Sequence, residues 1–411
     1  MSTASVGEFQ NTSPAKIAGR TFASLDGIRG IAILLVLLTH CKDYIPSVTI
    51  RIITVKQVLS YGWAGVDLFF VLSGFLITGI LLDTRKAGNY FSGFYARRVL
   101  RIFPLYYLVL TGVLVGASFM HPYPAALPLP EDRKLYFVYL TNWLGLWKGN
   151  WHANYLGHFW SLAVEEQFYL VWPICVWLLR PATLRRVGLI MLVGICLIRC
   201  AWVSTHGPSI ALTLATLTRM DGLIVGTLCA LLFRESESVK ASIKWLSWVA
   251  VVMLGCFVAG VMMLHDNFGL VESFVQTIGI SLLALGFGAL VLKAAATEGS
   301  PTLFQRLLCT KSLRTLGKYS YGIYIYHVPL LGLAAELFVR HNGAIRPNLL
   351  VWSFCLAFTT LAIPVIAAIS YEYFERPLLS LKRYFEPRFA TPAAATASVV
   401  IQESHAILNS D

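Results

Sequence analysis

The stretch from Ser24 to His40 carries an arginine and a histidine whose spacing suits chemistry on a long ligand. It reads Ser-Leu-Asp-Gly-Ile-Arg-Gly, continues as an apolar run and ends at Thr39 and His40. In a helix, the eleven steps from Arg29 to His40 bring both side chains to one face, roughly 16 Å apart along the axis. A cation at one end of that face and an imidazole farther along it can hold two parts of the same ligand.

Two further patterns place polar side chains on common helix faces. Arg98 and Arg101 are three residues apart, and two guanidinium groups so placed can fork onto phosphate oxygens. The alternative for this pair is a positive-inside anchor that contacts lipid headgroups. Farther along, His158, Ser161 and Glu165 can share one face, so the carboxylate can bond a hydroxyl or set the charge and tautomer of an imidazole. Pairing of Glu165 with an arginine is the structural alternative.

Ionisable side chains also interrupt the apolar runs. They are costly inside a bilayer and usually face a cavity or a partner, so they are candidate functional residues. Structural pairs, such as Arg219 with Asp221, are the alternative for some of them. The full set is His40, Asp67, Glu165, Glu166, Arg199, Arg219, Asp221, Glu272 and His327.

Two of these residues lie in distinctive local sequences. Asp67 precedes Ser73 and Gly74, whose small side chains predict a tightly packed span with Asp67 at its outer end. His327 follows tyrosines at alternate positions and is closely followed by Pro329, which predicts a bent span. A buried histidine with a structural role is the alternative for His327.

The elements that must position these side chains are membrane spans. The 411-residue chain is 57% hydrophobic and only 13% charged, with a mean hydropathy of +0.67. A soluble protein usually has about twice that charged fraction. The cysteines show no metal-ligand spacing, and no metal site is expected. The composition predicts an all-α, polytopic transmembrane helical bundle.

The apolar runs predict about ten spans, and the aromatic segment 135–147 is too short to cross and is read as re-entrant or interfacial. The predicted spans are 29–45, 60–82, 102–119, 158–179, 187–203, 209–233, 244–264, 271–293, 319–339 and 349–371.

The distribution of Lys and Arg orients these spans. With a cytoplasmic N-terminus, 23 of the 33 Lys and Arg fall in inside segments and 8 in outside segments. This asymmetry predicts an even number of spans with both termini cytoplasmic. It also accounts for the net charge of +12 without nucleic acid as a partner. We expect a disordered N-terminal segment at 1–21, a membrane domain at 22–378, and a mostly disordered cytoplasmic tail at 379–411.

Five blocks follow one another along residues 22–378. They are the Arg29–His40 spacing, Asp-Leu-Phe-Phe-Val-Leu-Ser-Gly-Phe-Leu-Ile from Asp67, the Arg98–Arg101 pair, Trp-Ser-Leu-Ala-Val-Glu-Glu-Gln-Phe-Tyr from Trp160, and Tyr-Ile-Tyr-His-Val-Pro before a closing Glu-Arg-Pro. Together they resemble the acyltransferase-3 family of polytopic membrane acyltransferases, which O-acylate bacterial surface polysaccharides, peptidoglycan and related acceptors.

The resemblance implies a role for each candidate residue. It marks His40 as the catalytic general base, Arg29 as its partner, and Glu165 as a catalytic residue that orients the imidazole or balances its charge. Arg98 and Arg101, together with Arg29, are expected to bind the phosphates of acyl-CoA. The expected substrate-binding residues are Asp67, Ser161 and His327.

The resemblance also implies a function. A multi-pass protein of the bacterial inner membrane would move an acyl group, with acetyl favoured, from cytoplasmic acyl-CoA to a hydroxyl of a surface polysaccharide or its lipid-linked precursor. Acyl-CoA is a donor substrate here, and no permanently bound cofactor is expected. Transfer can be direct or pass through an acyl-histidine. A macrolide or a lipid hydroxyl is an alternative acceptor. A transporter or flippase that performs no acyl transfer is the alternative function.

Overall fold

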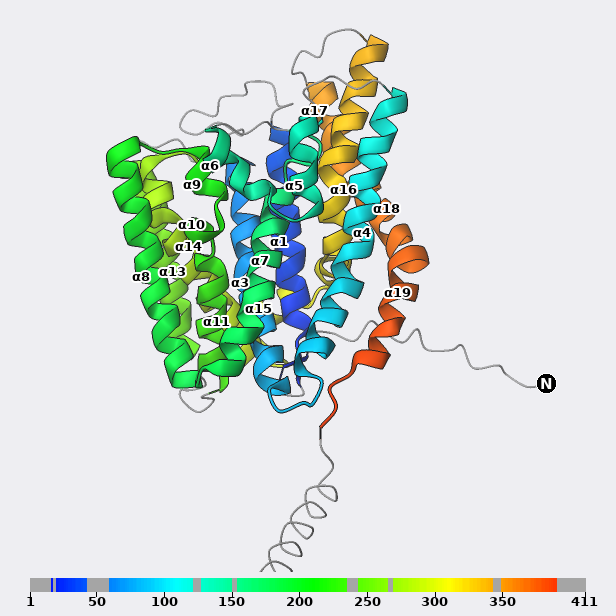
Figure 1. Cartoon of the computed structure of the whole chain (residues 1–411). Coiled ribbons are helices and arrows are strands. Elements are labelled where there is room, and N and C mark those ends of the chain that lie inside the picture. The colour runs from blue at the N-terminus through cyan, green and yellow to red at the C-terminus, as the bar shows by residue number, and fades with distance from the viewer. Residues whose placement is uncertain are drawn as a thin grey trace, which may run out of the picture.

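The computed structural model describes residues 16–17, 20–42, 59–120, 127–149, 154–234, 243–264, 269–342 and 349–389. These residues form one α-helical bundle, which confirms the predicted fold class (Figure 1). Two strands of two residues each, β1 (Lys16–Ile17) and β2 (Arg20–Thr21), pair antiparallel ahead of the first helix. Most of the predicted N-terminal segment, and the predicted tail beyond residue 389, lie outside the described residues.

The middle of the bundle is built around α1, which Figure 1 shows in blue between α3, α7 and α16. α1 contacts α16 and α3 along much of its length. The helices of this central group are α1 (Ala23–Cys41), α3 (Ala64–Thr84) after the 3-10 turn η2 (Tyr61–Trp63), α4 (Tyr90–Met120), α7 (Phe159–Leu178) and α16 (Lys311–Asn342).

A second group of helices covers α3 on the side away from α4 (Figure 1). It comprises α8 (Pro181–His206), α11 (Asp221–Arg234), α13 (Ile243–Met263), and α14 (Ile280–Ala296) with the π-helical turn η6 (Val275–Gly279) before it.

Short helices connect the long ones, and α5, α6 and α9 lie in the upper part of Figure 1. The short elements are η4 (Pro130–Asp132), α5 (Arg133–Phe137), η5 (Thr141–Trp143), α6 (Leu144–Lys148), α9 (Ile210–Leu214), α10 (Thr216–Arg219) and α15 (Leu303–Leu308).

The C-terminal part of the bundle is a chain of short helical pieces beside α4 and α16. In order they are α17 (Leu349–Ala357), the π-helical turn η7 (Phe358–Ala362), α18 (Ile363–Ser370), the π-helical turn η8 (Tyr371–Glu375), α19 (Arg376–Ser380) and the 3-10 helix η9 (Leu381–Phe385).

Seven helices in the described part of the chain are long and apolar enough to cross a membrane. They are Ala23–Cys41, Tyr61–Thr84, Tyr90–Gly116, Pro181–His206, Lys244–Met263, Val275–Ala296 and Val351–Phe385. The predicted spans 158–179 and 319–339 correspond to α7 and α16, which carry more polar residues, and 209–233 is divided among α9, α10 and α11. The count of ten and the cytoplasmic termini stay predictions. The predicted non-spanning segment 135–147 consists of short helical turns.

The outward faces of α8 and α13 show which surface meets lipid. Large apolar side chains are exposed along both helices: Leu189, Ile190, Val193, Leu197, Trp245, Trp248, Val251 and Met263. So many exposed large apolar side chains on neighbouring turns are unfavourable in water, but such a surface is ordinary against lipid tails, and it indicates contact with lipid. With the seven apolar helices, it identifies a multi-pass integral membrane protein.

Close helix approach at glycines fixes α1 and α3 in the bundle. A Cβ added to Gly27 would overlap the main-chain carbonyl of Leu308, and one added to Gly317 of α16 would overlap that of Asp26. On α3, a Cβ at Gly74 would overlap the carbonyl of Leu223. The predicted tight packing of the span that carries Gly74 is confirmed, and only glycine permits such backbone contact.

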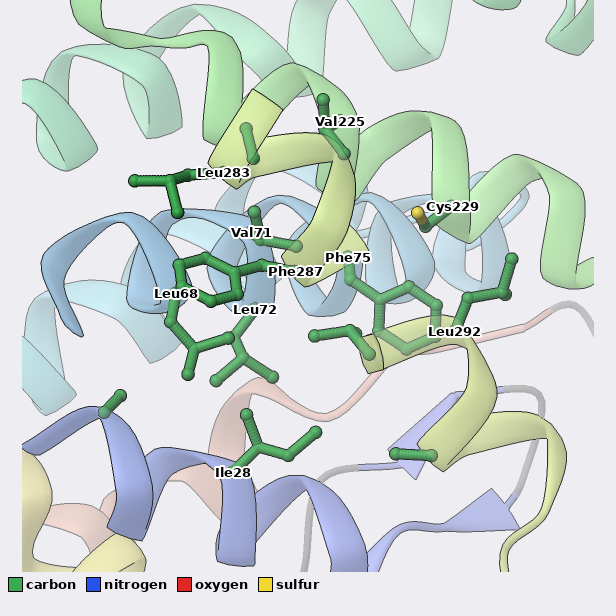
Figure 2. Close-up of a cluster of buried hydrophobic side chains, with 14 of the residues drawn as sticks. Ile28, Leu68, Val71, Leu72, Phe75, Val225, Cys229, Leu283, Phe287 and Leu292 are labelled. Carbon is green, nitrogen blue, oxygen red and sulfur yellow. The ribbon is translucent and has the colours of Figure 1, made fainter. Parts of the chain in front are cut away.

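Buried apolar side chains lock these helices together. Figure 2 shows one such cluster, in which residues of α1, α3, α11 and α14 interdigitate. Ile28 of α1 reaches toward Leu72 of α3, and Phe287 of α14 lies beside Val71. This packing holds α1 in register, and with it the two ends that carry Arg29 and His40.

Candidate functional site

A cavity of about 1300 Å³ lies among α1, α3, α4, α7, α16 and the C-terminal helices. On α3 its lining runs from Val66 to Ile80, which corresponds to roughly 21 Å of helix. A cavity of this length suits an elongated ligand.

One end of this cavity is strongly basic. Eight Lys and Arg side chains but only three carboxylates line the cavity. The cations are Arg29, Arg98, Arg101, Lys311, Arg314, Lys318, Arg376 and Lys382; the carboxylates are Asp26, Glu165 and Glu372. We call the region around Arg98 and Arg101 the basic end. An excess of positive charge at a partly enclosed surface attracts an anionic ligand.

The three predicted phosphate ligands all line this cavity. Arg98 and Arg101 lie on one face of α4, as their spacing predicts. Within the described chain neither makes an ion pair, and Nε of Arg98 is buried without a hydrogen-bond partner. Arg29 pairs with Asp26 one turn earlier on α1, with 2.7 Å between Nη1 and Oδ1. Two of the three guanidinium groups therefore have no ion-pair partner among the described residues, and carboxylates act on them only from a greater distance: Glu165 and Glu166 on Arg98, and Glu375 on Arg101.

Glu165 also lines the cavity. Its carboxylate accepts a hydrogen bond from the hydroxyl of Ser73 on α3, at 2.6 Å. Ser161, one turn earlier on α7, lines the same cavity, so the predicted shared face of these two residues is confirmed. His158, the N-cap residue of α7, does not line the cavity; its ring packs against Tyr324 and His327 of α16.

Two hydroxyl side chains, Ser161 and Tyr324, form a wall that we call the hydroxyl wall. Both line the cavity, and their oxygens are 2.5 Å apart. Tyr324 also donates to the main-chain carbonyl of His158 at 3.0 Å, and Ser161 donates to the same oxygen at 3.3 Å. The wall separates the cavity from the histidine that supplies this carbonyl.

Three histidines pack behind the hydroxyl wall, and we call them the histidine cluster. The ring of His327 contacts the rings of His40 and His158, each with 4.8 Å between centroids. Tyr324 of the wall contacts both His158 and His327. The cluster therefore joins the end of α1, the start of α7 and the middle of α16, although the three residues lie far apart in sequence.

Main-chain carbonyls of α16 set the tautomers of two of these histidines. Nδ1 of His327 lies 2.5 Å from the carbonyl of Tyr324, and Nε2 of His158 lies 3.3 Å from that of Ile325. A carbonyl only accepts, so each of these nitrogens carries the proton. Nε2 of His327 and Nδ1 of His158 are then lone-pair acceptors, and both are buried without a hydrogen-bond partner.

Asp67 occupies a different environment from the other predicted site residues. It is fully buried in the first turn of α3 and forms a two-pronged ion pair with Arg219, at 2.5 and 3.0 Å. Arg199 pairs with Asp221 at 2.9 Å and with Ser281 of α14. The pairing of Arg219 with Asp221 considered from the sequence is wrong, because the partners come from different helices. Asp67 does not line the cavity.

Sequence reasoning left some residues of this region without a role. Ser73 was interpreted as a packing residue, yet it holds Glu165. From the sequence, Tyr324 is one of the tyrosines at alternate positions before His327, and Lys382 belongs to the predicted C-terminal tail at 379–411. The hydroxyl of Tyr324 could have been suspected from its place three residues before His327, on the same helical face. Among the described residues there is no group of three or more His, Cys, Asp or Glu arranged to hold a metal ion.

Comparison with known proteins finds O-acetyltransferases among the relatives of this chain. The chain is 28% identical to the peptidoglycan O-acetyltransferase OatA of Listeria monocytogenes, over 82% of this chain and 56% of the relative. It is 26% identical to the O-acetyltransferase OatA of Staphylococcus aureus strain MRSA252, over 93% and 62% respectively. It is 28% identical to the putative peptidoglycan O-acetyltransferase YrhL of Bacillus subtilis, over 87% and 55%. The chain thus spans little more than half the length of these relatives.

No solved structure matches the chain. A family comparison does: the Acyl_transf_3 family, described as an acyltransferase domain, matches residues 22–369. This range includes α1, the Arg98–Arg101 pair, the hydroxyl wall and the histidine cluster. The chain belongs to the Acyl_transf_3 family of acyltransferases.

Proposed function

We propose that this protein transfers an acyl group, with acetyl favoured, from acyl-CoA to a hydroxyl of a carbohydrate acceptor in the membrane. One observation carries the proposal: a single cavity connects two arginines that form no ion pair in the described chain to a hydroxyl wall that backs onto the histidine cluster. The relatives are named as O-acetyltransferases, which supports acetyl as the transferred group. One of them is named as a peptidoglycan O-acetyltransferase, which supports a carbohydrate as the acceptor.

The basic end is proposed to bind the CoA phosphates. Arg98 and Arg101 form no ion pair with a carboxylate in the described chain, and phosphate oxygens suit their forked donors. Arg29 is positioned to add a third guanidinium, although Asp26 offsets part of its charge. The predicted topology places this end at the cytoplasm, where the positive-inside rule concentrates Lys and Arg.

The thioester is proposed to reach the hydroxyl wall. Ser161 and Tyr324 there present hydroxyls to the interior end of the cavity. Ser161 is proposed to turn its hydroxyl proton from its long bond to the carbonyl of His158, 3.3 Å, toward the oxyanion that forms when a thioester carbonyl is attacked. Ser161 is thus assigned to the acyl group of the donor, in keeping with its expected role in substrate binding.

His40 is proposed as the general base. Its neutral imidazole takes the proton of the acceptor hydroxyl as that oxygen forms a bond to the thioester carbon. The carbon–sulfur bond then breaks, and the imidazolium returns the proton to the sulfur, which leaves as the CoA thiol. Base catalysis of this type typically contributes about 10²–10⁴-fold.

His327 is proposed to assist on the acceptor side. Its ring contacts His40, and its Nε2 lone pair is unused in the described chain. A sugar hydroxyl can donate to this nitrogen and so be held beside the base. This proposal keeps the substrate-binding role expected for His327 from the sequence, although its ring is fully buried and does not line the cavity.

Glu165 and Asp67 receive different assignments. Glu165 is proposed to act on the donor side, because it bonds Ser73 in the cavity and shares that cavity with Arg98. Asp67 is proposed to act structurally, because its carboxylate is saturated by Arg219 and fully buried.

The test is acyl transfer by the full chain in lipid nanodiscs, supplied with acetyl-labelled acetyl-CoA and soluble peptidoglycan fragments. We expect release of the CoA thiol together with labelled ester on the fragments, and loss of both in His40→Ala. Movement of a solute without release of the CoA thiol would instead establish the transporter alternative.

A further inference from the structure

The segment after α19 folds back onto the start of α4. It comprises residues 381–388, which we call the C-terminal strap. Asn89 donates from Nδ2 to the carbonyl of Glu386 at 2.9 Å and accepts from the main-chain N–H of Arg388 at 2.9 Å. Gly88 donates to the carbonyl of Arg388, and Arg97 donates to that of Phe385. Backbone and side-chain bonds thus hold the C-terminal half of the strap, from Phe385 to Arg388, against the start of α4.

The strap brings one cation into the cavity. Lys382 lines the cavity together with Arg98 and Arg101, although nearly 300 residues separate it from them in sequence. The charges that act on its ammonium group are those of Arg97, Arg98 and Arg101. In the described part of the chain, none of the three cavity cations makes an ion pair with a carboxylate.

Three like charges at one partly enclosed site repel one another. The repulsion is relieved when a multiply charged anion binds among them, so the site favours such a ligand. CoA carries a diphosphate and a 3′-phosphate on its nucleotide. Cations from two separate elements, α4 and the strap, can contact more than one of these groups at once.

We propose that the C-terminal strap is part of the donor site and that Lys382 is a phosphate ligand beside Arg98 and Arg101. This inference rests on the proposed acyl-CoA donor. It adds a segment beyond residue 369, where the family match ends.

The test measures binding of CoA to the full-length protein in nanodiscs. Lys382→Gln is expected to weaken CoA binding about tenfold, as loss of one charge-assisted phosphate contact would. The matched control is Arg383→Gln, which removes the same charge one residue later. Arg383 is exposed, bonds Tyr384 and does not line the cavity, so its substitution should leave CoA affinity unchanged.

Dephospho-CoA, which lacks the 3′-phosphate, identifies the group that Lys382 contacts. If wild type and Lys382→Gln bind dephospho-CoA equally, the lysine contacts the 3′-phosphate. If the tenfold difference persists, it contacts the diphosphate. Either pattern supports the inference.

The strap itself is tested through Asn89, which does not line the cavity. Asn89→Ala removes both side-chain bonds to the strap and should weaken CoA binding without removing a charge. Ser92→Ala, an exposed change in the first turn of α4, just after Asn89, is its control. Lys382→Arg should restore most of the affinity lost in Lys382→Gln, which shows that the variant protein is folded.

The two proposals fail in different ways. If Lys382→Gln and Asn89→Ala both bind CoA as tightly as the wild-type protein does, the strap inference alone is overturned. Wild-type protein that binds no CoA would overturn the proposed donor, and the strap inference with it.

Discussion

His158 donates a hydrogen bond from Nε2 to the main-chain carbonyl of Ile325, with 3.3 Å between the two atoms. Ile325 lies four residues before Pro329, inside α16. Proline has no N–H, so the helical bond that would normally end on this carbonyl cannot form. The imidazole of His158 takes its place. Pro329 of α16 thus fixes the tautomer of His158, which precedes α7. In this tautomer Nδ1 of His158 is a buried acceptor.

Pro329→Ala tests this relationship. The new N–H would compete with His158 for the Ile325 carbonyl, so the imidazole would lose its fixed orientation. We expect kcat to fall about tenfold, the effect of losing roughly one net hydrogen bond, with little change in KM for acyl-CoA. The control is Pro364→Ala on α18, outside the cavity and the histidine cluster. Equal kcat in wild type and Pro329→Ala would show that His158 needs no such restraint.

Removal of the His40 imidazole should abolish most acyl transfer. We expect His40→Ala to lower kcat by about 10²–10⁴-fold, the contribution typical of a positioned base. CoA affinity should stay close to the wild-type value, because His40 is not among the residues that line the basic end of the cavity. His206→Ala serves as the control, since His206 is exposed at the end of α8 and stacks on Trp202. Turnover in His40→Ala at the wild-type rate would rule out His40 as the base.

The two arginines of α4 distinguish a phosphate site from a membrane anchor. Replacing both Arg98 and Arg101 by Lys keeps the charge but removes the forked donors. We expect KM for acyl-CoA to rise about tenfold or more while KM for the acceptor is unchanged, because two forked contacts with phosphate are lost. The control is the double change of Arg185 and Arg186 to Lys, two basic residues on α8 that do not line the cavity. Unchanged use of acyl-CoA by the Arg98 and Arg101 variant would favour the anchor.

The Asp67–Arg219 pair makes a prediction about stability rather than catalysis. Both side chains are fully buried, and Trp160 and Phe70 flank the guanidinium. Asp67→Asn would leave an uncompensated buried cation, which typically costs about 3–5 kcal/mol. We expect a large fall in thermal stability in detergent, but no selective change in KM for the acceptor. The double variant Asp67→Leu, Arg219→Leu should recover part of the loss, because it removes both charges together.

A selective rise in the acceptor KM of Asp67→Asn at unchanged stability would restore the substrate-binding role expected from the sequence. The double variant separates the two explanations further. It lacks the carboxylate but carries no buried charge, so an acceptor-binding role predicts that its KM defect persists, and a structural role predicts that it does not.

Much of this protein follows from local sequence. Low charge and long apolar runs predict a helical membrane bundle. A single segment that crosses lipid satisfies its own backbone N–H and C=O groups when it is helical. The helical period places Arg98 beside Arg101, and Ser161 one turn from Glu165, and the structure keeps both pairs on the cavity. Both relationships lie within one helix, where spacing alone fixes the direction of each side chain.

Only the tertiary structure decided how distant residues meet. His40, His158 and His327 form one cluster because α1, α7 and α16 pack together, and no spacing along the chain encodes those contacts. The same holds for Asp67 with Arg219, and for Lys382, which a folded-back strap brings to α4. A helical period specifies which face a residue occupies but not which helix it will face. That choice depends on glycine contacts such as Gly27 against Leu308 and on the shape of the whole core.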